Sequence, residues 1–184
     1  MATGWYFDQI TVNDICPVGF VTHRLSRIGS RRGGDALLHK KRFKLKKLSA
    51  HISYRSFEFT DCSIDYLSSS LRIVVVYRPP PSKKNRLNVS LFLDEFSSLL
   101  ERLITPSSPL IIGCDFNFHL DDEFDRAAAR FQDLLEVFNL VQNVQGSTHT
   151  SGHTLDLVIC RQGEEPVKNV RVTDPVISDH SAVH

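Results

Sequence analysis

Several features that would place the sequence in a specialised class of protein are missing from it. The four cysteines, at positions 16, 62, 114 and 160, form no Cys-x-x-Cys pair, which excludes a zinc ribbon and a thioredoxin-type redox motif. No apolar run approaches the roughly 18 residues needed to cross a bilayer. The N-terminal segment MATGWYFDQI lacks the basic and apolar regions of a secretory signal. We therefore expect a nuclear or cytoplasmic protein with free thiols and no membrane role.

Internal repeats, low-complexity blocks and long Pro/Gly/Ser linkers are also missing. The chain has 184 residues, of which 41% are hydrophobic and 23% are charged. These values are typical of an ordinary soluble globular protein, and the length suits one domain with a substantial core. We expect a single domain over residues 1–184.

Charge of either sign is nearly balanced, with a net value of +1, but it is unevenly distributed. Residues 1–50 contain ten Lys or Arg and three Asp or Glu, whereas the remaining 134 residues contain 12 and 18. This asymmetry is compatible with a polyanionic ligand on one side and with metal or acid chemistry on the other. A solvated loop and a surface strand or helix edge over residues 29–47 would explain the basic run equally well.

Strand-like and helix-like segments alternate along the sequence. β-Branched and aromatic residues predict strands at residues 56–65, 71–78, 108–116 and 154–161, and amphipathic spacing predicts helices at 89–103 and 124–140. Asn139 is a plausible stop for the second helix. Two of the strands are almost continuously apolar, so we expect both of their faces to be covered. The alternation favours a layered α/β sandwich, and the prolines of residues 77–85 indicate a rigid exit loop.

Polar groups stand at the boundaries of these predicted strands. They are Tyr77, Asp115, Asn117, Asp156, Asp179 and His180. Element boundaries are where a rigid scaffold presents functional side chains. Carboxylates, an amide, a phenol and an imidazole, with no Ser or Cys in a nucleophile elbow, suit hydrolysis of a phosphate ester by an activated water. A divalent cation would neutralise charge in such a reaction.

Most of these residues also have a purely structural explanation, and Ser178, Asp179 and His180 fit an exposed turn equally well. Asp115 and Asn117 are common turn residues, and Tyr77 fits the edge of a core. Asp156 is harder to explain in this way, because an unpaired buried carboxylate is costly and needs a partner such as His180 or a metal.

Two further groups of polar residues carry weaker signals. His119, His149 and His153 match no standard zinc spacing, so they are either loop residues or substrate contacts. The acidic run at residues 121–125 is best explained by the start of a helix, where negative charge is favourable.

Seven stretches of the sequence together resemble one family. They are DICPVGF, RRGG, VVVYRPP, FLDEFSSLLERL, CDFNFHLD, THTSGHTLDLVI and VISDHSAV, in this order and over nearly the whole chain from about residue 5. The sequence resembles the endonuclease/exonuclease/phosphatase superfamily, and most closely the endonuclease domain of non-LTR (LINE-type) retrotransposons, which precedes a reverse transcriptase.

The resemblance implies a DNase I-like, four-layered α/β/β/α sandwich whose active site lies where the strand ends converge. It implies a DNA-nicking phosphodiesterase that uses Mg²⁺ (or Mn²⁺) and produces the 3′-hydroxyl that primes reverse transcription. DNA is the implied partner.

The resemblance also implies roles for single residues. Asp115 would position or activate the attacking water, Asn117 would hold the phosphate, and Asp156 would orient His180. His180 would contact the phosphate or transfer a proton, and Tyr77 would contact the phosphate or stabilise the leaving group. The remaining implied site residues are Asp179 as a metal ligand or supporting acid, and Thr148, Ser178 and Arg78 as substrate contacts.

The sequence departs from the family pattern at identifiable positions. Thr3 stands where the family has its principal metal-binding Glu, and Cys114 stands where it has a Gly. We expect a chain truncated at both ends, with impaired metal binding and doubtful independent activity. Two alternatives remain: a small-molecule phosphoesterase of the same fold, or a non-catalytic remnant that holds nucleic-acid phosphates. The remnant would bind through Lys40, Lys41, Lys44, Lys46 and Lys47.

Overall fold

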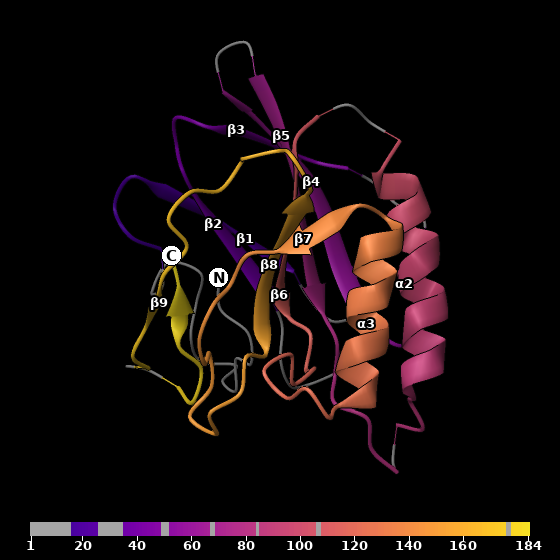
Figure 1. Cartoon of the computed structure of the whole chain (residues 1–184). Helices are drawn as coiled ribbons and strands as arrows, with labels where there is room; N and C mark the ends of the chain where they lie inside the picture. The colour runs from indigo at the N-terminus through magenta and orange to yellow at the C-terminus, as the bar shows by residue number, and fades with distance from the viewer. Residues whose placement is uncertain are drawn as a thin grey trace.

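A six-stranded mixed sheet forms the centre of the structure, which is a computed structural model (Figure 1). The structure describes residues 16–25, 35–48, 52–66, 69–83, 85–105, 108–175 and 178–184. The strands are β3 (Lys44–Lys47), β4 (Glu58–Tyr66), β5 (Ser69–Tyr77), β6 (Leu110–Asp115), β7 (Leu140–Gln142) and β8 (Asp156–Arg161). Their spatial order is β3-β4-β5-β6-β8-β7. Only β5 and β6 pair in parallel within this sheet.

The parallel pair is joined through α2 (Val89–Leu103), which coincides with the first predicted helix. Its N-terminus is capped by Asn88, whose side-chain oxygen accepts the Leu91 N–H at 2.8 Å. α3 (Arg126–Val137) begins after Asp125, which accepts the N–H groups of Ala127 and Ala128. The expected helix start at the acidic run is therefore confirmed for Asp125.

The second helix is shorter than predicted. It ends at Val137, and Asn139 follows in a left-handed conformation with a φ of 54°. Asn adopts this conformation more readily than most residues, so the predicted stop is confirmed. The prediction was wrong beyond that stop, because Leu140 begins β7, whose three residues are too few to show a strand period.

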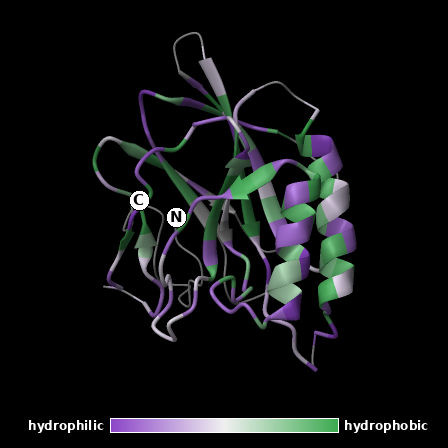
Figure 2. Ribbon diagram, in the orientation of Figure 1, coloured by the Kyte–Doolittle hydropathy of each residue, from purple (hydrophilic) through white to green (hydrophobic). Residues whose placement is uncertain are grey.

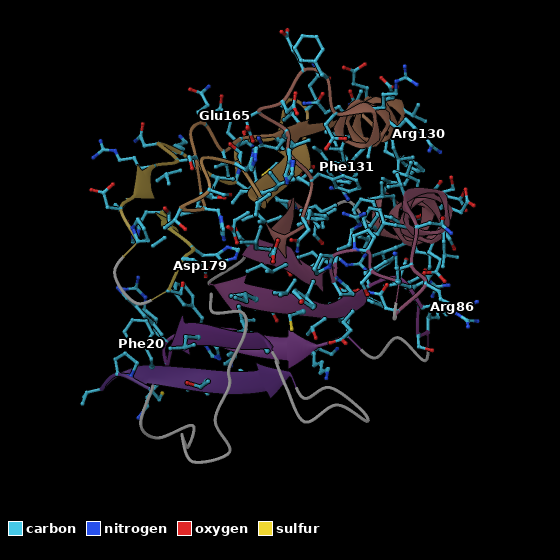
Figure 3. The ribbon with its side chains drawn as sticks, turned by 90° about the horizontal axis from the view of Figure 1, so that it is seen from below. Phe20, Arg86, Arg130, Phe131, Glu165 and Asp179 are labelled. Carbon is cyan, nitrogen blue, oxygen red and sulfur yellow. The ribbon has the colours of Figure 1, made fainter. Side chains whose placement is uncertain are left out.

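Both helices lie on one face of the sheet (Figures 1 and 2). They bury an aromatic cluster against it. The aromatic cluster is Phe57, Phe92, Phe96, Phe116, Phe118 and Phe131, each at most 2% exposed. In Figure 3, α2 and α3 are seen nearly end-on, and Phe131 projects toward the sheet whereas Arg130 projects outward. Ring centroids within the cluster lie as close as 4.7 Å, between Phe118 and Phe131. The predicted apolar stripes of the two helices therefore form the main core.

Two small antiparallel sheets complete the described structure. One pairs β1 (Phe20–Leu25) with β2 (Asp35–Lys40), and the other pairs β9 (Val172–Thr173) with β10 (Ala182–Val183). Figure 1 places β1, β2 and β9 away from the helices, on the opposite side of the central sheet. The α/β class is confirmed. In the described ranges the helices form one layer only, so the outer helical layer of the expected four-layered sandwich does not appear there.

The length and hydrophobicity of the two described helices decide whether either could span a membrane. Neither is long and apolar enough to cross a bilayer.

Candidate active site

Asp115 and Asp156 face each other across two neighbouring strands. β6 and β8 are antiparallel, so the last residue of β6 lies opposite the first residue of β8, and these residues are the two aspartates. β5 runs parallel to β6 and ends beside it, where the Arg78 N–H donates to the Asp115 carbonyl at 3.1 Å. The ends of β5 and β6 and the start of β8 thus lie together, and β6 and β8 each place a carboxylate at this edge of the sheet.

The alternation of side chains places both aspartates on the face away from the helices. Ile112 of β6 and Leu157 of β8 pack into the helix-facing core. Successive residues of a strand point to opposite faces, so Asp115 and Asp156 point to the other face. By the same alternation, Val76 is in the core and the half-buried Tyr77 shares the face of the two aspartates.

Asp156 is paired with His180, which comes from the last described segment of the chain. The Asp156 Oδ2 lies 2.7 Å from the His180 Nδ1, and both side chains are about three-quarters or more buried. An imidazole that donates its Nδ1–H to a carboxylate is held in one orientation and keeps its Nε2 directed away from that bond. The partner that the sequence required for Asp156 is therefore present.

Backbone and side-chain bonds hold this pair in place. His180 forms an antiparallel bridge with His149, and the Ser181 N–H donates to the Thr148 carbonyl at 2.8 Å. The Thr148 Oγ1 accepts the N–H groups of Leu155 and Asp156, both at 2.9 Å. Thr148 is fully buried, and these two bonds fix the start of β8. This role differs from the substrate contact that the resemblance implies.

The loop after Asp115 is locked by reciprocal bonds. Asn117 adopts a left-handed conformation with a φ of 51°, and its N–H donates to the Asp115 Oδ1 at 3.0 Å. Its side-chain Nδ2 donates to the Arg78 carbonyl at 2.9 Å. An Asn whose neighbours form such a turn tolerates positive φ at little cost. The turn and the site are therefore the same feature, because the turn fixes the Asp115 carboxylate.

Arg78 anchors this loop from the core side. Its Nη1 donates to the carbonyls of Phe116 and Asn117, at 3.0 and 2.8 Å. Its guanidinium lies over the Phe118 ring, 3.9 Å from the centroid, and near the Phe92 ring. Burial lowers the pKa of Arg78 to about 10, so the group remains a cation at neutral pH. With 3% of its surface exposed, Arg78 is a positioning residue, which differs from the substrate contact expected from the sequence.

Burial and charge together perturb the pKa of Asp115. Burial, followed by the charge of Asp156, raises this pKa to about 6, against the opposing effects of His180 and of the hydrogen bonds from Asn117. A carboxylate with a pKa near the working pH can accept a proton and release it again. Perturbed carboxylates of this kind are typical of functional sites.

His180 is shifted in the direction that favours its cation. The hydrogen bond to Asp156 raises its pKa, burial opposes the rise, and the charges of Asp156, Asp115 and Asp179 add to it. A positively charged imidazole beside two carboxylates suits a site for a phosphate, because it balances part of the negative charge.

The other predicted site residues lie at the exposed rim. The Asp179 carboxylate is 65% exposed, and its Oδ2 lies 3.2 Å from the His149 Nε2. Figure 3 places Asp179 on the side of the sheet opposite α2 and α3. The Ser178 Oγ accepts the His180 N–H at 3.1 Å, so Ser178 shapes the turn that carries the histidine.

Of the two departures from the family pattern, Thr3 and Cys114, the structure describes only the second. Thr3 lies outside the described residues. The backbone of Cys114 pairs with Leu157 in the regular ladder between β6 and β8, so the strand continues unbroken through the position at which the family has Gly.

Sequence reasoning missed two contributions to this end of the molecule. Asp121, assigned only to a helix start, accepts the Thr154 N–H at 2.7 Å and pairs with the His153 Nδ1 at 2.9 Å. The His153 ring stacks on His119, with centroids 3.9 Å apart. No sequence spacing signals these contacts, because they join two loops through tertiary packing.

The two strand-end carboxylates and the oriented imidazole thus lie together on a mixed sheet that helices cover on one face. The family model described as endonuclease-reverse transcriptase matches residues 71–184, which is more than half of the chain. The chain belongs to this family. A comparison with curated protein sequences finds no match.

Solved structures share the fold at low sequence identity. The endonuclease domain of TRAS1, a telomere-specific non-LTR retrotransposon, superimposes with a TM-score of 0.70 and 17% identity, over 90% of this chain and 76% of that chain. The human Nocturnin catalytic domain with bound sulfate gives 0.60 and 18%, over 90% and 70%. D. rerio TDP2 complexed with single strand DNA product gives 0.57 and 12%, over 90% and 76%. At these identities the similarity establishes the fold alone.

Proposed function

We propose that this chain is a phosphodiesterase that nicks DNA, with Asp115, Asp156 and His180 at its catalytic centre. The observation that carries the proposal is the convergence of these three residues, from three separate segments, at one edge of the sheet. The match to an endonuclease-reverse transcriptase family and the fold shared with a retrotransposon endonuclease domain support DNA as the substrate.

In the proposed reaction each residue has a part that is compatible with its position. Asp156 holds the His180 ring, and the His180 Nε2 then contacts the scissile phosphate or passes a proton to the leaving oxygen. Asp115 takes a proton from the attacking water, a role for which a pKa of about 6 is suited. Asn117 fixes the Asp115 carboxylate through its backbone N–H, and its side-chain amide lies beside this carboxylate, where it would contact the phosphate. Tyr77, on the same face, contacts the phosphate or the leaving group.

A divalent cation fits the donor set at this edge. Mg²⁺ binds through one or two carboxylates together with waters and substrate phosphate oxygens, and Asp179 offers an exposed carboxylate for this purpose. Mg²⁺ or Mn²⁺ bound there would neutralise charge that develops on the phosphate. Proton transfer and contact with the phosphate would come from the protein side chains named above.

Five lysines provide a surface that suits a polyanion. Lys40, Lys41, Lys44, Lys46 and Lys47, on and between β2 and β3, are all exposed. Exposed lysines contribute salt-sensitive affinity for nucleic-acid phosphates without reading sequence. The same lysines would also account for the alternative of a non-catalytic nucleic-acid-binding protein, so only a catalytic experiment separates the two.

The test is nicking of supercoiled plasmid with Mg²⁺ or Mn²⁺ by the wild type and by Asp115→Asn. We expect the substitution to lower the nicking rate by about 10²–10⁴-fold, the range for loss of a general acid or base. Asp133→Asn, the same change on an exposed position of α3, is the matched control and should nick like the wild type.

Three other outcomes would contradict the proposal. Equal nicking by Asp115→Asn and the wild type would remove Asp115 from the mechanism. DNA binding without nicking by the wild type would favour the non-catalytic alternative. Turnover of a small phosphodiester without nicking would favour a small-molecule phosphoesterase.

A further inference from the structure

A cluster of potential metal ligands lies at the exposed rim of the site. His149, Asp179 and His180 each offer one ligand atom, and the three atoms all lie within 4.8 Å of one another. The two imidazole rings meet edge to face, with centroids 4.9 Å apart. His149 has no part in the proposed hydrolysis, so that reaction does not explain why its imidazole lies beside Asp179 and His180.

The backbone holds the three ligands in a fixed arrangement. His149 and His180 are partners in an antiparallel bridge, and the Thr150 N–H donates to the Asp179 carbonyl at 2.9 Å. These bonds join two segments about 30 residues apart in the sequence directly at the ligand positions. Sites that bind a metal tightly are preorganised in this way.

The partners of the two imidazoles suit metal coordination. The His180 Nδ1 is bonded to Asp156, which leaves the Nε2 as the donor atom, and carboxylate–histidine–metal arrangements have this form. The His149 Nδ1 lies 2.7 Å from the Ser151 Oγ, and its Nε2 faces Asp179. A metal at the His149 Nε2 would take the place of the proton between His149 and Asp179 and would leave the ring proton on Nδ1. That proton would be donated to the Ser151 Oγ, and the Ser151 N–H, which donates to Nδ1 at 3.0 Å, would give up this acceptor.

The donor set selects the class of metal. Two imidazole nitrogens and one carboxylate oxygen suit Zn²⁺ and related transition-metal ions, whereas Mg²⁺ prefers oxygen donors. Three protein ligands leave a fourth position of a tetrahedral zinc site open to water or to a substrate oxygen. The exposed Asp179 provides a route of entry from solvent.

We propose that His149, Asp179 and His180 form a Zn²⁺ site whose occupation inhibits the enzyme. The inhibitory part rests on the proposed function. Zn²⁺ would use the His180 Nε2, which the hydrolysis needs for the phosphate or the proton. It would also occupy the Asp179 carboxylate, so Zn²⁺ and Mg²⁺ would compete at the rim.

The decisive measurement is Zn²⁺ binding, which does not require activity. Affinity is measured by titration calorimetry and by competition with a chromophoric chelator, and Co²⁺ is used as a spectroscopic substitute whose visible absorption reports a tetrahedral site. We expect His149→Ala and His149→Gln to weaken Zn²⁺ binding by at least about tenfold, because each loses a ligand. His153→Ala is the matched control, since His153 also pairs with an aspartate in an adjacent loop but lies outside the cluster.

Nicking assays then test the inhibitory effect. We expect His149→Ala to keep wild-type nicking in Mg²⁺ and to need at least about tenfold more Zn²⁺ for inhibition. Equal Zn²⁺ affinity in the wild type and both His149 variants would overturn the site. Loss of Zn²⁺ binding in these variants with no nicking by any protein would support the site and would contradict the proposed function instead.

Discussion

The two faces of the central sheet are built on different physical principles. On the helix-facing side, the aromatic cluster packs six phenylalanines at most 2% exposed, and each of them gains stability from burial. On the other side, the polar edge (Asp115, Asn117, Thr148, Asp156 and His180) brings two carboxylates together, and burial acts against the charged form of Asp115. The aromatic cluster stabilises the fold, whereas the polar edge contains charged groups that the rest of the fold must hold in place.

The two regions meet within four residues. In the stretch from Asp115 to Phe118, the aspartate and Asn117 serve the polar edge, whereas Phe116 and Phe118 belong to the aromatic cluster. Arg78 crosses this boundary, since it lies over the Phe118 ring and donates to backbone carbonyls of the Asp115 loop. Arg78 thereby links the aromatic cluster to the loop that positions the carboxylate. Removing a buried ring should destabilise the protein, whereas removing the buried charge of Asp115 should stabilise it.

The largest expected effect on stability is at the aromatic cluster. Phe131→Ala removes a fully buried ring that contacts Phe92, Phe96, Phe116 and Phe118. We expect the free energy of unfolding, measured with urea, to fall by about 3–5 kcal/mol. Phe124→Ala, at a position 84% exposed beside the same helix, should change it by less than about 0.5 kcal/mol. Similar losses in the two variants would show that the cluster is not the stabilising region.

The second expected effect is a gain in stability, and it comes from a substitution at the polar edge. The pKa of Asp115 is raised to about 6 in the folded protein, so its ionisation destabilises the fold. The penalty is absent below the unfolded-state pKa of about 4 and complete above about 6. A shift of about two units corresponds to roughly 3 kcal/mol. Asp115→Asn keeps the oxygen that accepts the Asn117 N–H and should stabilise the metal-free protein by up to about this amount at pH 8.

The measurement is urea unfolding of both proteins in EDTA from pH 4 to pH 8. The gain from Asp115→Asn should shrink as the pH falls and disappear near pH 4. A gain that is constant across this range would show that Asp115 is not destabilised by its charge. Asp133→Asn, on the surface of α3, should show no such dependence on pH.

The same contrast explains which features could be predicted from sequence. α2 was predicted to the residue because a helical apolar stripe is a local signal. The strands that carry Asp115 and Asp156 were also predicted, each one longer than observed, because a short apolar run rich in β-branched residues is a local signal too. By contrast, β1 was not predicted as a strand. A surface strand was only one alternative for residues 29–47, which contain β2 and β3, since this basic run carries no clear apolar period.

The finer details of the site depend on contacts that no local pattern encodes. Arg78 was expected to contact the substrate, but its guanidinium packs over the Phe92 and Phe118 rings, which belong to other segments of the chain. The proximity of His149 to Asp179 depends on a backbone bridge between two loops. The roles of the site residues implied by the family resemblance stay predictions until the variants are measured.

The smallest of the stability effects tests how the polar edge is held together. Thr148→Val keeps the shape of the side chain but removes the oxygen that accepts the Leu155 and Asp156 N–H groups. Burying backbone donors without that acceptor should cost about 1–3 kcal/mol in urea unfolding. Thr148→Ser keeps the hydroxyl and loses only a methyl group, so it should cost about 1 kcal/mol or less.

A second readout separates loss of this anchor from a general loss of stability. If Thr148 fixes the start of β8, Asp156 should shift in Thr148→Val and its hydrogen bond to His180 should weaken. The pKa of His180, followed by NMR of the ring protons, should then fall toward the ordinary histidine value, because that hydrogen bond is the main cause of its rise. In Thr148→Ser the His180 pKa should stay where it is in the wild type. An unchanged His180 pKa in a destabilised Thr148→Val would mean that the site is positioned by the His149–His180 bridge instead, and that the polar edge tolerates the loss of a buried hydroxyl.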